Sequence, residues 1–426
     1  MTNTVPGTEA PQSASQILDL QLSAGRQVKG ALHLPDDIGD SALAWDSSRP
    51  DVISSDGRVR RPSAGGSPVE VTLTVSAGGT RHEHVVSVPP LPTPESLFGY
   101  LMVHFVESRE DGGEQIYFSL SDGDDPLRWK RMNQGRPVLV SGKGTGAVRD
   151  PHVVRSPEGD RFFIVATDLH VHTTDWADAV RSGSRHIEIW RSDDLLDWGV
   201  QRHVRVSGES AGMTWAPEAI WDDTADAYFV HWTSALYKSP DRTHVPHSKI
   251  LGAYTRDFWH FSEPHVWIDP DLDPSLAGGS LLDATIAKTA DGYVRFVKGE
   301  VEGDLDEQGQ PLGDIFAERA PTLGTPANQW ERIGSALTFR ATGGHHPYEG
   351  PLVFRRNSGE EWLMFADHYG PDFHGYVPFA NADPATDRWR RVPAEETDIP
   401  PNTKHGAVLP LRAGEWERLA GSPLMR

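Results

Sequence analysis

Five segments of the chain begin with an acidic residue or a histidine and recur at a nearly constant interval. Their leading residues are Asp150, Glu218, Asp283, Glu349 and His405, spaced by about 56 to 68 residues, a period typical of β-propeller blades. Carboxylates that converge on a partly desolvated site repel one another, so the pKa of at least one of them rises. A protonated carboxyl can then act as a general acid and an ionised one as a general base.

Apolar runs follow the first four of these segments and complete a hairpin with each. They are Phe162–Ala166, Tyr228–Val230, Tyr293–Phe296 and Trp362–Phe365. A second series of segments, offset from the first, ends in a strand, a turn and an aromatic residue, as in Ile187–Trp198 and Ile250–Phe261. Blades of four strands explain both series. The sequence therefore predicts an all-β fold with a five-bladed β-propeller.

Closure of the propeller ring is indicated by two strands that lack a hairpin partner. One begins at His405 near the C-terminus, and the other is Leu97–Val103, just before the first repeat. We expect them to share the last blade, which removes an exposed sheet edge. The five leading residues are then expected at equal radius and height, all pointing into one end of the central channel. Asp-Pro or Glu-Gly-Pro alone is an ordinary turn sequence, but its recurrence at matching positions favours a site.

The repeat and its motifs resemble glycoside hydrolase family 43 over residues from about 97 to 420. The matching stretches are Arg149-Asp150-Pro151, Trp215-Ala216-Pro217-Glu218, Leu282-Asp283, Glu349-Gly350-Pro351 and Lys404-His405-Gly406. The sequence departs from the family pattern at Glu218, where the family often has Asp, and at Asp283-Ala284, which lacks the usual Pro. The resemblance implies a five-bladed propeller that hydrolyses glycosides.

Catalytic roles follow from the resemblance, position by position. It implies that Asp150 is the general base, that Asp283 orients the acid and tunes its pKa, and that Glu349 is the general acid. It also implies inversion at the anomeric carbon, for which base and acid stand about 6.5–9.5 Å apart with a water between base and sugar. Residues expected to bind substrate are Arg149, Trp215, Glu218 and His346.

The expected substrate is a pentose-containing plant polysaccharide or oligosaccharide, cleaved by an α-L-arabinofuranosidase or β-D-xylosidase type of activity. An exo-β-1,3-galactanase type of hydrolase and a non-catalytic glycan-binding propeller remain alternatives. A retaining fructosidase-type propeller is disfavoured because the chain has no Cys and no Asn-Asp-Pro-Asn strand.

His405 resembles a channel histidine that lies near a hydrated calcium-like ion in many family members. A neutral imidazole is a poor ligand for a hard cation, so a structural calcium would be held through water. The alternative is a histidine that only hydrogen-bonds to neighbouring strands. No required cofactor is expected, and zinc is disfavoured because the chain has no H-E-x-x-H pattern.

Domain organisation is predicted from changes in composition. Residues 1–16 are polar and are expected to be disordered, and 17–90 carry alternating strand patterns such as Val69–Val75, typical of a small β-sandwich. The stretch Trp45–Ile53, together with Asp56-Gly57-Arg58-Val59, resembles atrophied bacterial immunoglobulin-like domains. A Pro-rich linker at 91–96 precedes the catalytic propeller at 97–426.

Composition limits the partners of the protein. The formal net charge is −21 with no basic run, which argues against nucleic acid, because phosphate binding needs clustered Lys and Arg. No apolar stretch of membrane-spanning length occurs. No signal-peptide pattern is present at the N-terminus, so a cytoplasmic protein is expected, or a secreted one if a signal has been removed. The expected partner is a carbohydrate.

Overall fold

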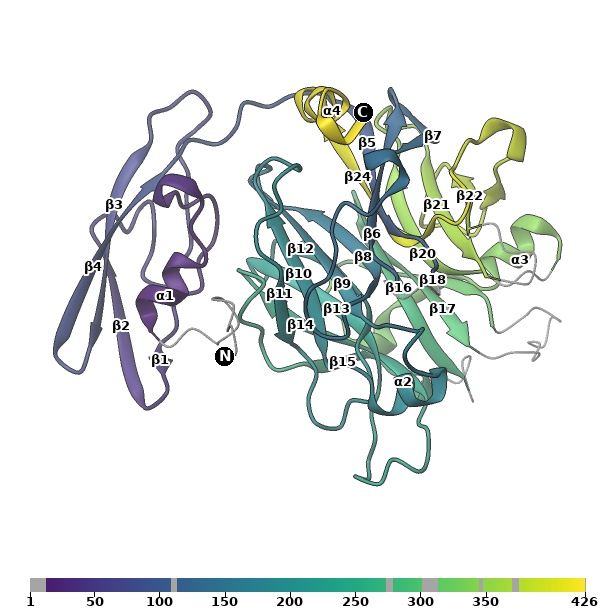
Figure 1. Cartoon of the computed structure of the whole chain (residues 1–426), viewed down its shortest axis with the longest axis horizontal. Helices are drawn as coiled ribbons and strands as arrows, with labels where there is room; N and C mark the ends of the chain where they lie inside the picture. The colour runs from purple at the N-terminus through teal and green to yellow at the C-terminus, as the bar shows by residue number, and fades with distance from the viewer. Residues whose placement is uncertain are drawn as a thin grey trace, which may run out of the picture.

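The computed structural model describes residues 13–108, 113–272, 279–300, 313–344, 348–369 and 375–425. Within them the strands form six four-stranded antiparallel sheets (Figure 1). The first sheet belongs to the N-terminal module and has the order β1 (Asp37–Ile38), β2 (Ser41–Ser47), β3 (Val69–Ala77) and β4 (Thr80–Val88). The other five sheets are the blades of a β-propeller.

Each blade runs outward from an inner strand. Blade 1 has β8 (Val148–Arg155), β9 (Phe162–Asp168), β10 (His186–Ser192) and β11 (Arg202–Arg205), and blade 2 has β12 (Trp215–Asp222), β13 (Ala227–Ala235), β14 (Ser248–Thr255) and β15 (His265–Ile268). Blade 3 has β16 (Ser280–Thr289), β17 (Gly292–Glu300), β18 (Ile315–Ala320) and β19 (Glu331–Gly334), and blade 4 has β20 (Tyr348–Arg355), β21 (Trp362–His368), β22 (Gly375–Asn381) and β23 (Arg390–Arg391).

Blade 5 combines strands from both ends of the propeller, in the order β24 (Lys404–Arg412), β5 (Leu97–Phe105), β6 (Ile116–Asp122) and β7 (Asp125–Arg131). Ala407 pairs with Val103 in the β24–β5 register, and Figure 1 shows the two strands side by side. The inner strands contact one another in the cyclic order β8, β12, β16, β20, β24 and back to β8. Both the five-bladed propeller and its predicted closure are confirmed.

Apolar side chains fill the space between neighbouring blades. Trp190 and Phe118 lie in the cluster between blades 5 and 1, and Trp232 and Phe258 in the cluster between blades 1 and 2. Similar clusters lie between blades 2 and 3, 3 and 4, and 4 and 5. Burying one such large side chain stabilises the fold by roughly 1.5–3 kcal/mol. The core therefore holds the five blades around one axis, with their inner strands closest to it.

Short helices lie before the first strand, in connections between strands and after the last strand. The α-helices are α1 (Ala14–Asp19), α2 (Trp176–Ser182), α3 (Leu337–Thr342) and α4 (Ala413–Ala420). The 3₁₀-helices are η1 (Ala24–Arg26), η2 (Asn133–Gly135), η3 (Pro270–Leu272), η5 (Ala327–Gln329), η6 (Ala394–Glu396) and η7 (Pro423–Met425). In the described part of the chain, every helix is too short or too polar to cross a membrane.

The N-terminal module has one sheet, and its second layer consists of α1 and extended segments. Leu18, Val28 and Ile53 from this layer pack on Val71 and Val86 of the sheet. The prediction of disorder for residues 1–16 is wrong at its end, because α1 begins at Ala14. Its first turn is capped by the Ser13 side chain, which accepts a hydrogen bond from the Gln16 N–H at 3.2 Å, and its apolar face is buried.

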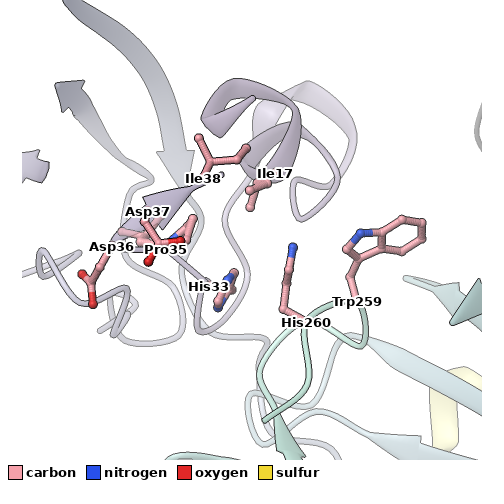
Figure 2. A pocket seen from close by; sticks show the side chains of 9 residues that line it. Ile17, His33, Pro35, Asp36, Asp37, Ile38, Trp259 and His260 are labelled. Carbon is pink, nitrogen blue, oxygen red and sulfur yellow. The ribbon is translucent and has the colours of Figure 1, made fainter. Parts of the chain in front are cut away.

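The module packs against the ends of blades 1 and 2. The Arg61 guanidinium contacts the Asp160 carboxylate at 2.7 and 3.0 Å, in the turn between β8 and β9. A cavity of about 610 Å³ lies in the same seam, where Figure 2 shows His33 of the module facing His260 of the β14–β15 turn, with ring centroids 4.1 Å apart. A second cavity of about 530 Å³ shares Trp259 with it.

Candidate active site

The inner strands are irregular near the ends where they begin. Their pairing shifts by a β-bulge between Arg149 and His152 in β8, and at corresponding places in the other four inner strands. The backbone turns left-handed there, with φ of 49° at Asp150, 46° at Ala216, 45° at Asp283 and 53° at Gly350. A left-handed backbone is unfavourable for residues other than glycine and clusters at functional sites. The bulges re-aim these side chains toward the channel.

Side chains from the second strands hold the bulges in place across the blade boundaries. Thr167 of β9 accepts a hydrogen bond from the Ala216 N–H at 2.7 Å, and Thr233 of β13 accepts one from the Asp283 N–H at 3.3 Å. Asp367 of β21 accepts one from the His405 N–H at 3.4 Å. In blades 2, 3 and 5, the bulge is therefore held by a side chain of the preceding blade.

A cavity of about 90 Å³ opens at this end of the channel. It is lined by Phe105, Arg149, Asp150, Leu169, Trp176, Trp215, Leu282, Asp283, Glu349, Asp367 and His405. Six residues expected from the sequence are thus brought together: Arg149, Asp150, Trp215, Asp283, Glu349 and His405. His346 lies outside the described residues.

The expectation that the five leading residues occupy equivalent positions is wrong in detail. Asp150 and Asp283 are themselves the left-handed residues, whereas Glu218 comes two positions after Ala216 and Glu349 one position before Gly350. Glu218 is buried and does not line the cavity; its carboxylate lies 3.4 Å from Nδ1 of His152. Its expected contact with substrate is therefore not supported.

Asp150 is arranged to stay ionised. Burial alone would raise its pKa, but a hydrogen bond and positive charge from His405, with Arg149 and Thr167, bring the pKa below its ordinary value. The Thr167 hydroxyl donates to Asp150 Oδ2 at 2.9 Å, and Nδ1 of His405 lies 3.4 Å from Oδ1. The Asp150 side chain keeps 16% of its surface exposed, so water from the cavity can reach this carboxylate.

Glu349, in contrast to Asp150, is arranged to stay protonated. Burial raises its pKa to about 8, and the neighbouring carboxylates of Asp283 and Asp367 contribute, while Lys404 and Arg149 partly oppose the shift. The pKa of Asp283 is also raised, by burial and by Asp150, against the effect of His405. Oδ2 of Asp283 accepts a hydrogen bond from the Gly350 N–H at 3.1 Å. Asp283 therefore holds the backbone next to Glu349 and adds negative charge near it.

His405 supplies positive charge at the centre of the site. Burial would lower its pKa, but Asp283, Asp150 and Glu218 raise it to about 10. A protonated imidazole has no free lone pair for a metal, so His405 itself does not fit the role of a ligand. A calcium ion held through water stays a prediction.

One group in the described residues has the spacing of a metal site, and it lies elsewhere, on blade 1. It consists of Asp168, Glu188 and His203. Nδ1 of His203 lies 2.5 Å from Glu188, whose other oxygen accepts from Gln201, while Asp168 accepts from the Thr145 hydroxyl at 2.8 Å. An ion pair with its hydrogen bonds accounts for these contacts without a metal.

Five further residues line the cavity: Phe105, Leu169, Trp176, Leu282 and Asp367. Leu169 and Trp176 belong to the loop 169–186, which the sequence predicts at the rim of the pocket. The Arg149 guanidinium lies between two of the lining aromatic rings, 4.7 Å from the centroid of Phe105 and 5.3 Å from that of Trp176. Trp176 also packs edge-on against Trp215, at 5.9 Å. The long insertion before β10 was a signal for Trp176, but Asp367 ends a strand that otherwise reads as apolar core.

Comparisons with known families identify both parts of the chain. Residues 95–417 match the model of a family related to glycoside hydrolase family 43 and described as a probable glycosyl hydrolase domain. Residues 12–88 match the atrophied bacterial Ig domain. The chain therefore belongs to this family of glycosyl hydrolases and carries an atrophied immunoglobulin-like domain before its propeller.

A curated relative, an α-L-arabinofuranosidase from Bifidobacterium longum subsp. longum, is 30% identical over 410 residues, covering 84% of this chain and 37% of that protein. The chain thus spans little more than a third of the length of this relative.

Solved structures of similar fold include a thermostable family-43 glycoside hydrolase, at 17% identity and a TM-score of 0.39, covering 60% of this chain and 76% of the other. An α-L-arabinofuranosidase mutant from Fusarium graminearum has 14% identity and a TM-score of 0.43, covering 80% and 81%.

Proposed function

We propose that this protein is an inverting glycoside hydrolase that releases a terminal pentose, with an α-L-arabinofuranoside as the first substrate to test. The observation that carries the proposal is the pair of opposite pKa shifts in one cavity, lowered at Asp150 and raised to about 8 at Glu349. At neutral pH one carboxyl is then ionised and the other protonated, which is the arrangement that acid–base hydrolysis of a glycoside needs.

In the proposed reaction, Asp150 removes a proton from water while the water oxygen bonds to the anomeric carbon. The bond from that carbon to the leaving oxygen breaks, and Glu349 gives its proton to this oxygen. Before the proton transfer, His405 balances the negative charge of Asp150 and Asp283. One water is consumed, and the attack from the opposite side inverts the anomeric configuration.

The size of the cavity supports the choice of a terminal sugar. At about 90 Å³ it is far smaller than the roughly 300–1,000 Å³ of pockets for drug-sized ligands, so it suits one sugar ring. Trp176 of α2 and Phe105 form part of its wall. The arabinofuranoside is favoured over a β-D-xyloside by the 30% identical relative, and a screen of aryl pentosides separates the two.

The proposed role of Glu349 as general acid is tested with two substrates that differ in their leaving groups. A general acid matters in proportion to how poorly the leaving group bears negative charge. Glu349→Ala should keep much of its rate on a dinitrophenyl arabinofuranoside and lose about 10²–10⁴-fold on an alkyl arabinofuranoside or an arabino-oligosaccharide. Proton NMR of the first product formed should show inversion. An equal loss on both substrates, or initial retention, would contradict the proposal.

A further inference from the structure

Asp367 and Lys404 form a buried ion pair beside the proposed acid. Nζ of Lys404 lies 2.8 Å from Oδ1 of Asp367, and the two side chains are 2% and 1% exposed. Asp367 stands directly opposite Glu349 in the β20–β21 register, and both line the cavity. Two carboxyls therefore face each other across adjacent strands, and one of them has a lysine as partner.

Equivalent positions in other blades show that the backbone contact made by Asp367 does not require a charged side chain. The residue opposite Arg149 is Thr167, and the residue opposite Trp215 is Thr233. Both threonines accept a backbone hydrogen bond from the next inner strand, as Asp367 does from His405. A neutral hydroxyl performs this task in blades 1 and 2, so the backbone contact does not explain a buried carboxylate in blade 4.

The charges around Glu349 come from four strands. Asp283 of β16 and Asp367 of β21 raise its pKa, in addition to burial, whereas Lys404 of β24 and Arg149 of β8 lower it. Two adjacent buried carboxyls cannot both ionise readily, so one of them keeps a proton. Burial also raises the pKa of Asp367, but its ion pair with Lys404 favours the charged form. The proton therefore stays on Glu349.

We propose that Asp367 and Lys404 are a positioning pair that keeps the transferable proton on Glu349. This inference rests on the proposed role of Glu349 as general acid. Asp367 supplies the negative charge that holds the proton, and Lys404 limits that charge so that Glu349 can still release the proton to the leaving oxygen.

The test is the alkaline limb of the pH profile of kcat/KM, measured on an alkyl arabinofuranoside. Asp367→Asn removes a negative charge near Glu349 and keeps the positive charge of Lys404, so the limb should move down by about one pH unit or more. Lys404→Met should move it up. The double variant removes both charges and should return the limb toward that of the wild type. Arg61→Ala, which breaks a buried ion pair with Asp160 away from the cavity, is the control and should not move the limb.

Rates on a dinitrophenyl arabinofuranoside separate this effect from general damage, because that substrate needs little acid assistance. The charge variants should retain most of this rate. A limb that stays in place in folded Asp367→Asn, or moves the same way in both single variants, overturns the inference while the hydrolase proposal stands. Where a single variant does not fold, the double variant and the other single variant decide. Absence of hydrolysis by the wild type would instead overturn the proposed function.

Discussion

The cavity and the seam with the N-terminal module lie at opposite ends of blades 1 and 2, and they use charge in opposite ways. In the seam, buried charges have their own partners, as Arg61 has Asp160 and Lys29 has Asp193. In the cavity, four carboxyls share His405 and Lys404. The seam holds the larger cavities, about 610 and 530 Å³ against about 90 Å³. Crowded like charges on a left-handed backbone, and not a large volume, therefore distinguish the proposed site from the seam.

The largest expected effect is at Asp150. Asp150→Asn keeps the shape of the side chain but cannot take a proton from water, so the rate should fall about 10²–10⁴-fold on activated and natural substrates alike. The melting temperature should change little, because the lost attraction to His405 is offset by relief of repulsion with Asp283. Hydrolysis assays and thermal unfolding check both. Activity close to that of the wild type would remove Asp150 from the proposed mechanism.

A smaller effect is expected in the seam, and on stability instead of rate. Arg61→Ala removes a 2% exposed guanidinium from Asp160 and from the backbone carbonyls of Lys29 and Pro89. Breaking such a pair should cost about 2–4 kcal/mol in unfolding free energy, near the lower end for buried pairs because Asp160 keeps contact with water.

The matched control is Arg58→Ala, since Arg58 is 64% exposed and its pair with Asp56 is a surface contact. Its effect on unfolding should be below about 0.5 kcal/mol. Denaturant unfolding measures both variants. Neither should change kcat/KM on an aryl arabinofuranoside while the protein is folded. A loss of kcat/KM in folded Arg61→Ala would show that the two ends of the blades are coupled.

The smallest expected effect is the pH dependence of stability. The folded-state pKa of His405 is raised from 6.5 to about 10, so its stabilisation is complete below about pH 6.5 and is lost as the pH rises toward 10. Glu349, raised from 4.5 to about 8, also makes stability fall as the pH rises between those values. The melting temperature should drop by about 2–5 °C between pH 6.5 and 9.5. His405→Gln should flatten this drop, and an equally steep drop in that variant would contradict the assignment.

The blades and their order could be predicted from the sequence because the repeat is visible in strand patterns. The pairing of Leu97–Val103 with the strand from His405 was also visible, since each lacked a partner. The exact positions of the acidic side chains could not be predicted, because a β-bulge at a non-glycine residue such as Asp150 or Asp283 leaves no sequence signal. Glu218 was placed in the cavity for that reason.

Asp367 was missed for a different reason. It follows the apolar run Trp362–Phe365 in a buried strand, and a single carboxylate there reads as the polar end of a hairpin. Its importance depends on the register that sets it opposite Glu349 and on Lys404 from another blade. Such pairings between distant segments exist only in the folded ring. The contact between Arg61 and Asp160 also joins segments that are distant in the sequence, so it could not be predicted either.

The closure of the ring by β24 has a consequence for how the protein gains activity during its synthesis. Lys404 and His405 are the first two residues of β24, the strand that pairs with β5. The four carboxyls of the cavity are translated earlier, and until β24 docks they face one another without these two cations. A nascent chain therefore has its carboxyls before it has the positive charges on which the proposed roles of acid and base depend. Hydrolytic activity should therefore appear only after β24 has paired with β5 to complete the last blade.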